Sequence, residues 1–217
     1  MDRIPLHLRL KRETHRKIAY AQDLIVWEVY RKDEKAVLHG GTAIWRCFYG
    51  KRFSEDLDFY FRKGRRTIES IFAELEKKGF KIIKKKISER SVYSELLWER
   101  TRVRLEATFQ KVEGALSDYE TSEGNIMTVY SLTPEMFIKE KIAAYLKRLK
   151  IRDLWDVFFL LRFAKINAVK SELRKLIKNY KSPADEQDLK AIIIEGIVPS
   201  SKEMIENIRR KWEKENI

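Results

Sequence analysis

The arrangement of apolar and polar residues changes along this chain, and the change predicts two parts that meet near residue 130. In the first part, segments with the 3.6-residue period of helices alternate with segments that have the two-residue period of strands. In the second part, nearly every segment has the helical period. We therefore predict an α+β fold: a small mixed β-sheet flanked by helices over residues 1–130, followed by a C-terminal helical bundle over residues 131–217.

The first part contains predicted helices over residues 13–31, 42–49 and 67–78. The longest has an apolar stripe at helical spacing, formed by Ile18, Ala21, Ile25 and Val29. Strands are predicted over residues 57–61, 80–87, 103–109 and 126–130, the last at an edge of the sheet. Residues 91–98 fit either a strand or a helix, and the polar residues 114–124 are predicted to form a loop.

The helical part has a start signal at Thr133, Pro134 and Glu135. Threonine is favoured at the N-cap, proline at the first helical position and an acidic residue in the first turn. We therefore predict a helix that begins at Pro134. Further breaks in the helical pattern fall near Lys150, Lys165, Pro183 and Pro199.

The composition argues against several classes of protein. No apolar run approaches the roughly 18 residues that a membrane span needs, and the charged N-terminal segment lacks the apolar stretch of a signal peptide. A cytoplasmic protein without membrane association is therefore expected. The single cysteine, Cys47, excludes an intramolecular disulfide, and with only three histidines it argues against a zinc site.

The chain carries 46 Lys and Arg residues against 33 Asp and Glu residues, which gives a formal net charge of +13. Basic residues are concentrated in the segments 81–86 and 147–152. An excess of this size favours polyanionic partners, RNA or DNA first. The alternative is a generally lysine-rich composition that has no role in binding.

Gly40, Gly41 and Thr42 directly precede or begin the predicted helix at residues 42–49. Glycine permits a positive φ and a close approach of the backbone to a ligand. The bare N–H groups of such a turn, together with the partial positive charge of a helix N-terminus, can hold phosphate oxygens. The Thr42 hydroxyl could add a hydrogen bond to a phosphate. The alternative is a simple turn with an N-cap residue.

Asp56 and Asp58 alternate with apolar residues around the start of the predicted strand that follows. Residues two apart on a strand share a face, so the two carboxylates would lie together and would repel each other without a cation. Mg²⁺ prefers such oxygen ligands and commonly arrives with substrate phosphates. The alternative is an exposed strand end that pairs with lysines.

Glu106 lies between Arg104 and Thr108 on the polar face of a later strand. If that strand neighbours the first, Glu106 supplies a third carboxylate, and three acidic side chains can hold two Mg²⁺ ions about 4 Å apart. The alternative is a cross-strand salt bridge. With the diglycine turn, these carboxylates favour nucleotidyl or phosphoryl transfer.

The segment LHGGTAIWRCFYGKRFSEDLDF, residues 38–59, resembles the signature of the AbiEii-like nucleotidyltransferase toxins, a branch of the DNA polymerase β-type nucleotidyltransferase superfamily. A second block, made of residues 140–144, Arg148 and residues 152–156, resembles the helical motif of that family. The resemblance covers residues from about 35 to 165. Glu106 is a modest departure, because the residue at the third acidic position is Glu rather than Asp.

The resemblance implies roles for several more residues. Lys141 corresponds to a lysine that contacts the triphosphate, and Asp153 and Asp156 correspond to an acidic pair in the helical part. On this basis we predict that Lys141 and Asp156 are catalytic, and that Arg148 and Asp153 bind the nucleotide. Arg52 is a further candidate for phosphate binding. The alternative for the helical residues is ordinary amphipathic packing with solvated charges.

These residues predict an enzyme that transfers a nucleoside monophosphate from an NTP to an acceptor hydroxyl with two Mg²⁺ ions. The resemblance implies that the acceptor is a tRNA 3′ end, and that the chain is the toxin of a type IV-like toxin–antitoxin system with a cognate antitoxin protein. Two alternatives remain open. The same fold could transfer AMP to a protein partner, or it could be a non-catalytic nucleic-acid-binding protein.

Overall fold

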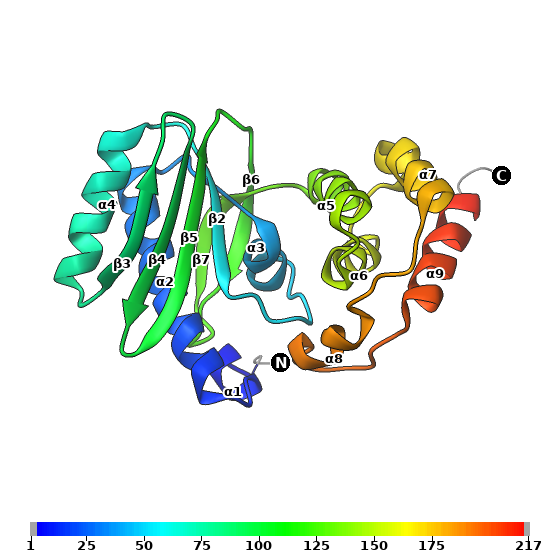
Figure 1. The fold of residues 1–217 in the computed structure, drawn as a ribbon, viewed down its shortest axis with the longest axis horizontal. Helices are drawn as coiled ribbons and strands as arrows, with labels where there is room; N and C mark the ends of the chain where they lie inside the picture. The colour runs from blue at the N-terminus through cyan, green and yellow to red at the C-terminus, as the bar shows by residue number, and fades with distance from the viewer. Residues whose placement is uncertain (1–3, 215–217) are drawn as a thin grey trace. The chain divides into compact units, whose positions relative to one another are not determined.

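The computed structural model describes residues 4–214, and the chain divides into two compact units at the bond between Ser131 and Leu132. The first unit is a mixed β-sheet with helices, and the second unit is helical (Figure 1). The predicted α+β fold class is therefore confirmed.

The described part of the first unit contains a seven-stranded sheet with the strand order β3-β4-β5-β2-β1-β7-β6. Two of the pairings, β2 with β5 and β1 with β7, are parallel, and the others are antiparallel. The strands are β1 (Val37–His39), β2 (Asp56–Phe61), β3 (Lys81–Ile87), β4 (Ser91–Trp98), β5 (Thr101–Phe109), β6 (Ala115–Glu120) and β7 (Ile126–Ser131).

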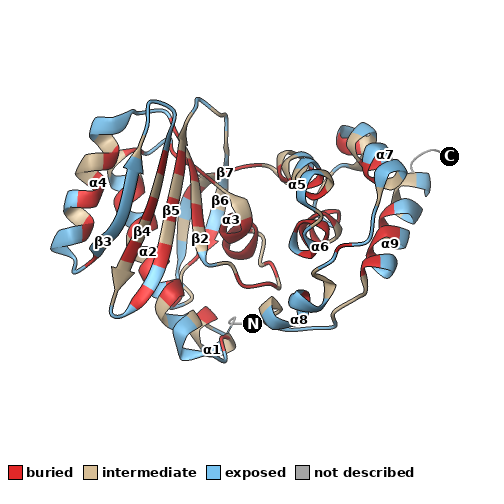
Figure 2. Ribbon diagram, in the orientation of Figure 1, coloured by how far each residue is buried: buried red, intermediate tan, exposed pale blue. Residues whose placement is uncertain are grey.

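The helices of this unit are α1 (Leu6–Arg9), α2 (Glu13–Lys32), α3 (Gly40–Cys47) and α4 (Arg65–Lys77). The two long ones, α2 and α4, pack on each other and on the sheet, with α4 beside β3 and α2 behind the central strands (Figure 1). The predicted stripe of α2 is buried, as are Leu57 and Phe59 of β2 (Figure 2). Tyr30 of α2 meets the Phe59 ring edge-on at 6.2 Å, so this side of β2 faces α2.

Two predictions for this unit were wrong, and one ambiguity is resolved. Residues 114–124, predicted to form a loop, contain the strand β6, which lies at the sheet edge. The 126–130 strand therefore lies inside the sheet as β7 rather than at its edge. The sequence of β6 lacks the alternation of apolar and polar residues typical of a strand, because only Tyr119 and Glu120 of this edge strand are buried. Residues 91–98 form the strand β4, which pairs with β3 and β5.

A buried ionic hub joins α2, α3 and β6. The Asp23 carboxylate accepts hydrogen bonds from the Arg46 guanidinium, from the Tyr119 hydroxyl at 2.9 Å and from the Ser122 N–H at 2.7 Å. Arg46 also donates to the Glu120 carbonyl oxygen at 2.7 Å, and its side chain is fully buried. The hub thus fixes α3, the helix that begins at Gly40, against the rest of the unit.

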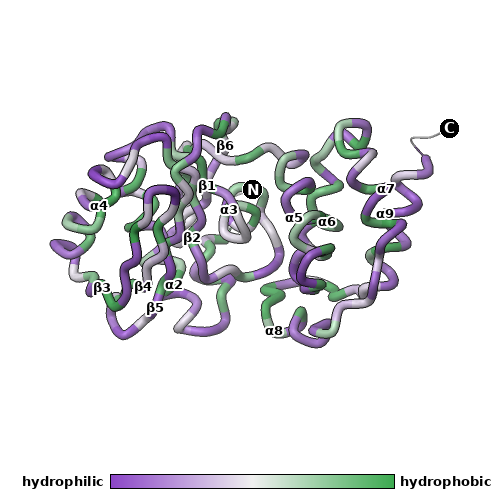
Figure 3. Tube along the Cα trace, turned by 45° about the horizontal axis from the view of Figure 1, so that its top comes forward, coloured by the Kyte–Doolittle hydropathy of each residue, from purple (hydrophilic) through white to green (hydrophobic). Residues whose placement is uncertain are grey.

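The second unit is built from helices α5 (Pro134–Arg148), α6 (Ile151–Leu160), α7 (Lys170–Asn179), α8 (Leu189–Ile192) and α9 (Ser201–Lys214), with short 3₁₀ helices η1 (Ile166–Val169) and η2 (Glu186–Asp188). The predicted start of α5 is confirmed, because Thr133 Oγ1 accepts a hydrogen bond from the Met136 N–H at 3.4 Å and Pro134 is the first helical residue. Helix α6 is mainly apolar, whereas α9 is mainly hydrophilic with an apolar side formed by Met204, Ile205 and Ile208 (Figure 3). Within residues 4–214, no helix combines the length and apolar character required to cross a bilayer.

The hub makes a prediction about stability. Replacing Asp23 with Ala leaves the buried Arg46 guanidinium without its carboxylate partner, and such a change typically costs about 3–5 kcal/mol. Asp118→Ala is the matched control, because Asp118 is an exposed residue of β6, and exposed substitutions usually change stability by less than about 0.5 kcal/mol. Urea denaturation of both variants measures the difference, and an equal small loss in both would contradict the role of the hub.

Candidate active site

Three neighbouring strands place two predicted site residues, Asp58 and Glu106, in one row with His39. His39 of β1 pairs with Asp58 of β2 in the antiparallel register, and Asp58 pairs with Glu106 of β5 in the parallel register. Paired residues on adjacent strands share a face, so the carboxylates of Asp58 and Glu106 emerge side by side. Asp56 lies on the same face one step along β2, where it pairs with Arg104.

The diglycine lies directly against this row. Gly40 has a φ of +72°, and a methyl group added to it would lie 2.0 Å from Oδ2 of Asp58. No larger residue fits without moving that carboxylate. The predicted proximity of Gly40 and Asp58 is therefore present in the structure. The predicted helix start at Thr42 was two residues late, because both glycines belong to the first turn of α3.

Gly41 is constrained by a different pair of neighbours. A methyl group on Gly41 would lie 2.6 Å from Arg52 Nη2 and 2.6 Å from Ser54 Oγ. Arg52 is 4% exposed and donates a hydrogen bond to the Phe53 carbonyl oxygen at 3.3 Å. The Arg52 guanidinium therefore lies against the first turn of α3, as a phosphate-binding arginine requires, although most of its surface is covered.

The Thr42 hydroxyl has a structural role. Thr42 is fully buried, and its hydroxyl donates to the backbone carbonyl oxygen of Asp56. The predicted contact between this hydroxyl and a phosphate therefore finds no support in the structure. Gln22 of α2, which the sequence did not single out, reinforces the same loop by donating from Nε2 to the carbonyl oxygens of Ser54 and Glu55, both at 3.0 Å.

Arg104 holds the carboxylate of Asp56. Its Nε and Nη2 atoms donate to Oδ1 and Oδ2 of Asp56, each at 2.6 Å, in a two-pronged contact between neighbouring strands. A cross-strand salt bridge is the alternative role for Glu106, but in the structure Arg104 and Asp56 form that bridge. Only pairing of the strands reveals it, since 48 residues separate the two side chains in sequence.

Glu106 lies in an electrostatically unfavourable place. Burial raises the pKa of Glu106, the carboxylates of Asp58 and Asp56 raise it further, and Arg104 and His39 offset part of the effect. The three carboxylates are therefore close enough to repel one another. Within residues 4–214, however, no three His, Cys, Asp or Glu side chains are arranged so that they could hold a metal ion as they stand.

The site residues predicted in the second unit form an ion-pair cluster that joins α5 to α6. Lys141 Nζ lies 2.8 Å from Asp156 Oδ2 and 3.8 Å from Asp153 Oδ1. Arg148 donates from Nε and Nη2 to the Asp153 carboxylate, both at 2.7 Å. Asp153 and Asp156 are fully buried and Lys141 is 8% exposed. The sequence grouped these residues correctly, and in the structure their charges compensate one another.

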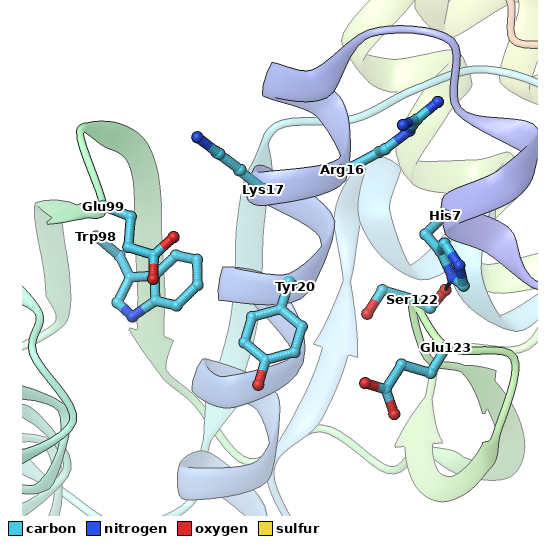
Figure 4. A pocket seen from close by; sticks show the side chains of 8 residues that line it. All are labelled: His7, Arg16, Lys17, Tyr20, Trp98, Glu99, Ser122 and Glu123. Atoms are coloured by element: carbon cyan, nitrogen blue, oxygen red, sulfur yellow. Dashed lines mark hydrogen bonds between the residues drawn. The ribbon is translucent and has the colours of Figure 1, made fainter.

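A cavity of about 470 Å³ lies elsewhere in the first unit (Figure 4). Its lining includes Tyr20 of α2 and Trp98 of β4, whose ring centres are 5.2 Å apart. Tyr93 and Glu95 of β4 pair with Glu106 and Arg104 and so share their face of the sheet. Because strand residues alternate between faces, Trp98 lies on the opposite face. None of the predicted site residues lines this cavity.

Comparison with known proteins identifies the family of the chain. Residues 28–215 match the family described as "Nucleotidyl transferase AbiEii toxin, Type IV TA system". The chain belongs to this family. It is therefore an enzyme of a nucleotidyltransferase family whose members are toxins of type IV toxin–antitoxin systems, as the segment 38–59 predicted.

Solved structures show the same fold. JHP933 from Helicobacter pylori has a TM-score of 0.64 and 19% identity over 94% of this chain and 96% of its own. A second H. pylori structure, described as a candidate nucleotidyltransferase, has a TM-score of 0.64 and 20% identity over 94% of this chain and 98% of its own. A comparison with curated proteins found none that matches.

Gly40 offers a test of the contact with Asp58. Gly40→Ala is expected to abolish nucleotide transfer, because the new methyl group displaces the Asp58 carboxylate. Gly79→Ala is the matched control: Gly79 also has a left-handed backbone, with φ of +87°, but no atom lies within 4 Å of an added methyl group. Both variants should lose about 1–2 kcal/mol from backbone strain, as measured by thermal unfolding. Equal activity in the two variants would show that the contact is irrelevant.

Because the pKa of Glu106 is raised, we expect that replacing this residue with Gln stabilises the fold at neutral pH. The folded protein binds a proton at this carboxyl more tightly than the unfolded chain does. The protonated group therefore stabilises the fold at low pH, and this contribution is lost as the pH rises above the ordinary pKa of 4.5 and through the raised pKa. Glu106→Gln is therefore expected to raise the melting temperature at neutral pH and to have little effect below pH 4.5.

Glu95→Gln is the contrasting variant for this experiment. The hydrogen bond from the Tyr93 hydroxyl lowers the pKa of Glu95, so its carboxylate stabilises the fold above the ordinary value of 4.5. Glu95→Gln should lower the melting temperature at neutral pH, and the difference should vanish as the pH falls through the lowered pKa. The same sign of effect in both variants would refute the raised pKa of Glu106.

Proposed function

We propose that this chain transfers a nucleoside monophosphate from an NTP to a hydroxyl of an RNA acceptor, and that the reaction takes place at Asp58 and Glu106 beside the first turn of α3. The observation that carries the proposal is the contact between Gly40 and Asp58. It brings the first turn of α3 to a pair of adjacent carboxylates, and a helix N-terminus is a natural site for phosphate.

The acidic residues fit Mg²⁺ in kind, because carboxylate oxygens are its preferred protein ligands. Asp58 and Glu106 would hold it, and Asp56 would join them once Arg104 releases its carboxylate. When bound, Mg²⁺ neutralises phosphate charge and lowers the pKa of an attacking hydroxyl. Burial and then the carboxylates of Asp58 and Asp56 raise the pKa of Glu106, and a bound cation would relieve the repulsion among these carboxylates.

The chain's own residues divide the remaining tasks. The N–H groups at Gly40 and Gly41 hold the terminal phosphates of the NTP, and Arg52 lies close enough to Gly41 to assist. Glu106, with its raised pKa, is suited to accept the proton of the acceptor hydroxyl. Arg104, once its guanidinium leaves Asp56, would supply a positive charge on the same face of the sheet.

The predicted site residues of the second unit are held in ion pairs, which limits what they can bind. Lys141 is already paired with Asp156 and Asp153. Binding of a phosphate oxygen by Lys141 therefore requires its amine to leave a carboxylate partner. While these ion pairs persist, the carboxylates of Asp153 and Asp156 hold the Lys141 amine, and Arg148 pairs with Asp153 instead of binding a nucleotide.

The acceptor is proposed to be RNA, because the net charge of +13 favours a polyanion. The resemblance to the nucleotidyltransferase toxins makes a tRNA 3′ end the first choice. A cognate antitoxin protein is the proposed partner, in keeping with the family. Transfer of AMP to a protein remains the rival within the same fold. The two acceptors are distinguished by which macromolecule becomes labelled.

The test uses the full chain with labelled NTPs, Mg²⁺ and total tRNA. We expect label to accumulate on RNA in the wild-type reaction. Asp58→Asn and Glu106→Gln should each lower the rate by at least about 100-fold, because each removes a carboxylate that holds the cation or accepts the proton. Asp118→Asn, an exposed change of the same kind on β6, should leave the rate unchanged.

Three results would contradict the proposal. Labelling of RNA that survives both substitutions would place the chemistry elsewhere. Labelling of protein instead of RNA would favour the AMP-transfer alternative. Binding of RNA without any Mg²⁺-dependent binding or turnover of NTP would identify a non-catalytic member of the family.

A further inference from the structure

The face of the sheet that carries the carboxylates continues across two more strands. Glu106 pairs with Tyr93 of β4, and Tyr93 pairs with Lys86 of β3. In the neighbouring row, Arg104 pairs with Glu95, and Glu95 pairs with Lys84. Because paired residues share a face, the lysines of the edge strand β3 lie on the same side of the sheet as Asp58 and Glu106.

The two sides of these strands differ in burial. On the side opposite the carboxylates, the residues Val92, Ser94, Leu96, Val103, Leu105 and Ala107 are buried. Lys85 is on that opposite side, where its amine pairs with Glu69 of α4 at 2.8 Å. Lys84 and Lys86, one residue to either side, are exposed and lie on the carboxylate side. Most of β3 is exposed (Figure 2). Successive lysines of β3 therefore point to opposite sides: Lys85 points towards α4, and Lys84 and Lys86 point towards the carboxylate side of the sheet.

This open face is strongly basic beyond the carboxylates. Its exposed cationic side chains are Lys81, Lys84, Lys86 and Arg102, and its acidic member among the strands β3 and β4 is Glu95. The Glu95 carboxylate already accepts a hydrogen bond from the Tyr93 hydroxyl at 2.5 Å. Lys84 lies 5.1 Å from the centre of the Tyr93 ring. We call Lys81, Lys84, Lys86, Tyr93 and Arg102 the basic face.

We infer that the basic face binds the phosphate backbone of the acceptor RNA and leads its reactive hydroxyl to Asp58 and Glu106. The inference rests on the proposed function and adds the location of the acceptor. Neighbouring strands lie about 4.8 Å apart, so Lys86 is roughly 14 Å across the sheet from Asp58. Such a distance suits a ligand that continues beyond its reacting group, as a polynucleotide does.

The chemistry of the basic face favours RNA over an acidic protein segment. Lysine ammonium groups pair with successive phosphates without requiring a fixed geometry. Tyr93, half-buried among them, offers a ring on which an unpaired base can stack. An acidic peptide would use the lysines but would have no need of the aromatic ring between the lysines and the carboxylates.

The test replaces the two central lysines in the full chain. The double variant Lys84→Gln/Lys86→Gln is titrated against a fluorescein-labelled RNA hairpin with a single-stranded 3′ tail, without NTP, and binding is followed by fluorescence anisotropy at several salt concentrations. We expect binding to weaken by about 10-fold or more at moderate salt. The slope of log K against log salt concentration should become shallower by roughly 1.4, since each single-strand phosphate contact contributes roughly 0.7.

The matched control is Arg66→Gln/Lys77→Gln. It removes the same charge from exposed residues of α4, the helix that packs on the opposite side of the sheet. If general charge alone attracts RNA, both double variants lose the same affinity and the inference fails. Tyr93→Leu adds a second measurement: it should weaken binding without changing the salt slope, because stacking releases no counterions.

The outcomes separate this inference from the proposed function. Unchanged RNA affinity in Lys84→Gln/Lys86→Gln overturns the inference, even if nucleotide transfer is observed. Loss of affinity confined to that variant supports it, even if no transfer occurs and the proposed function fails. A variant that keeps its RNA affinity and loses labelling of a protein acceptor would assign the face to a protein partner and would also overturn the inference.

Discussion

The burial of one side of β2 is the constraint on which the candidate site depends. Leu57 and Phe59 are fully buried, and because successive strand residues face opposite sides, Asp56 and Asp58 must emerge on the other side. Pairing with β1 and β5 then decides which residues stand beside Asp58. A shift of one residue would turn the carboxylates into the core. The packing that stabilises the sheet therefore also fixes the chemistry of its open face.

Two charged clusters contain the predicted site residues, and their charges are balanced to different degrees. In the second unit, two cations and two buried carboxylates compensate one another, so the cluster joins α5 to α6. In the first unit, Arg104 compensates Asp56, while burial and nearby carboxylates raise the pKa of Glu106. Uncompensated charge of this kind reduces stability and is common where a ligand completes the site.

The lysine-rich strand β3 is explained by its position at the sheet edge. An antiparallel edge can keep one face packed and the other in water, and β3 places Lys85 against α4 while its neighbours remain exposed. Charged residues on an edge strand also hinder pairing with another chain. The same residues can thus protect the edge and present positive charge on the face that leads to Glu106.

Local features were determined by the sequence itself: the long helix α2, the N-cap at Thr133, the alternation in β5 and the family signature at residues 38–59. Each depends on residues close together in the chain. The strand order, the pairing of Asp56 with Arg104, the support from Gln22 and the burial of the Thr42 hydroxyl were decided only by the tertiary structure. These depend on segments far apart in the chain: 48 residues separate Asp56 from Arg104, and the partner of each side chain follows from strand pairing and packing rather than from its neighbours in sequence.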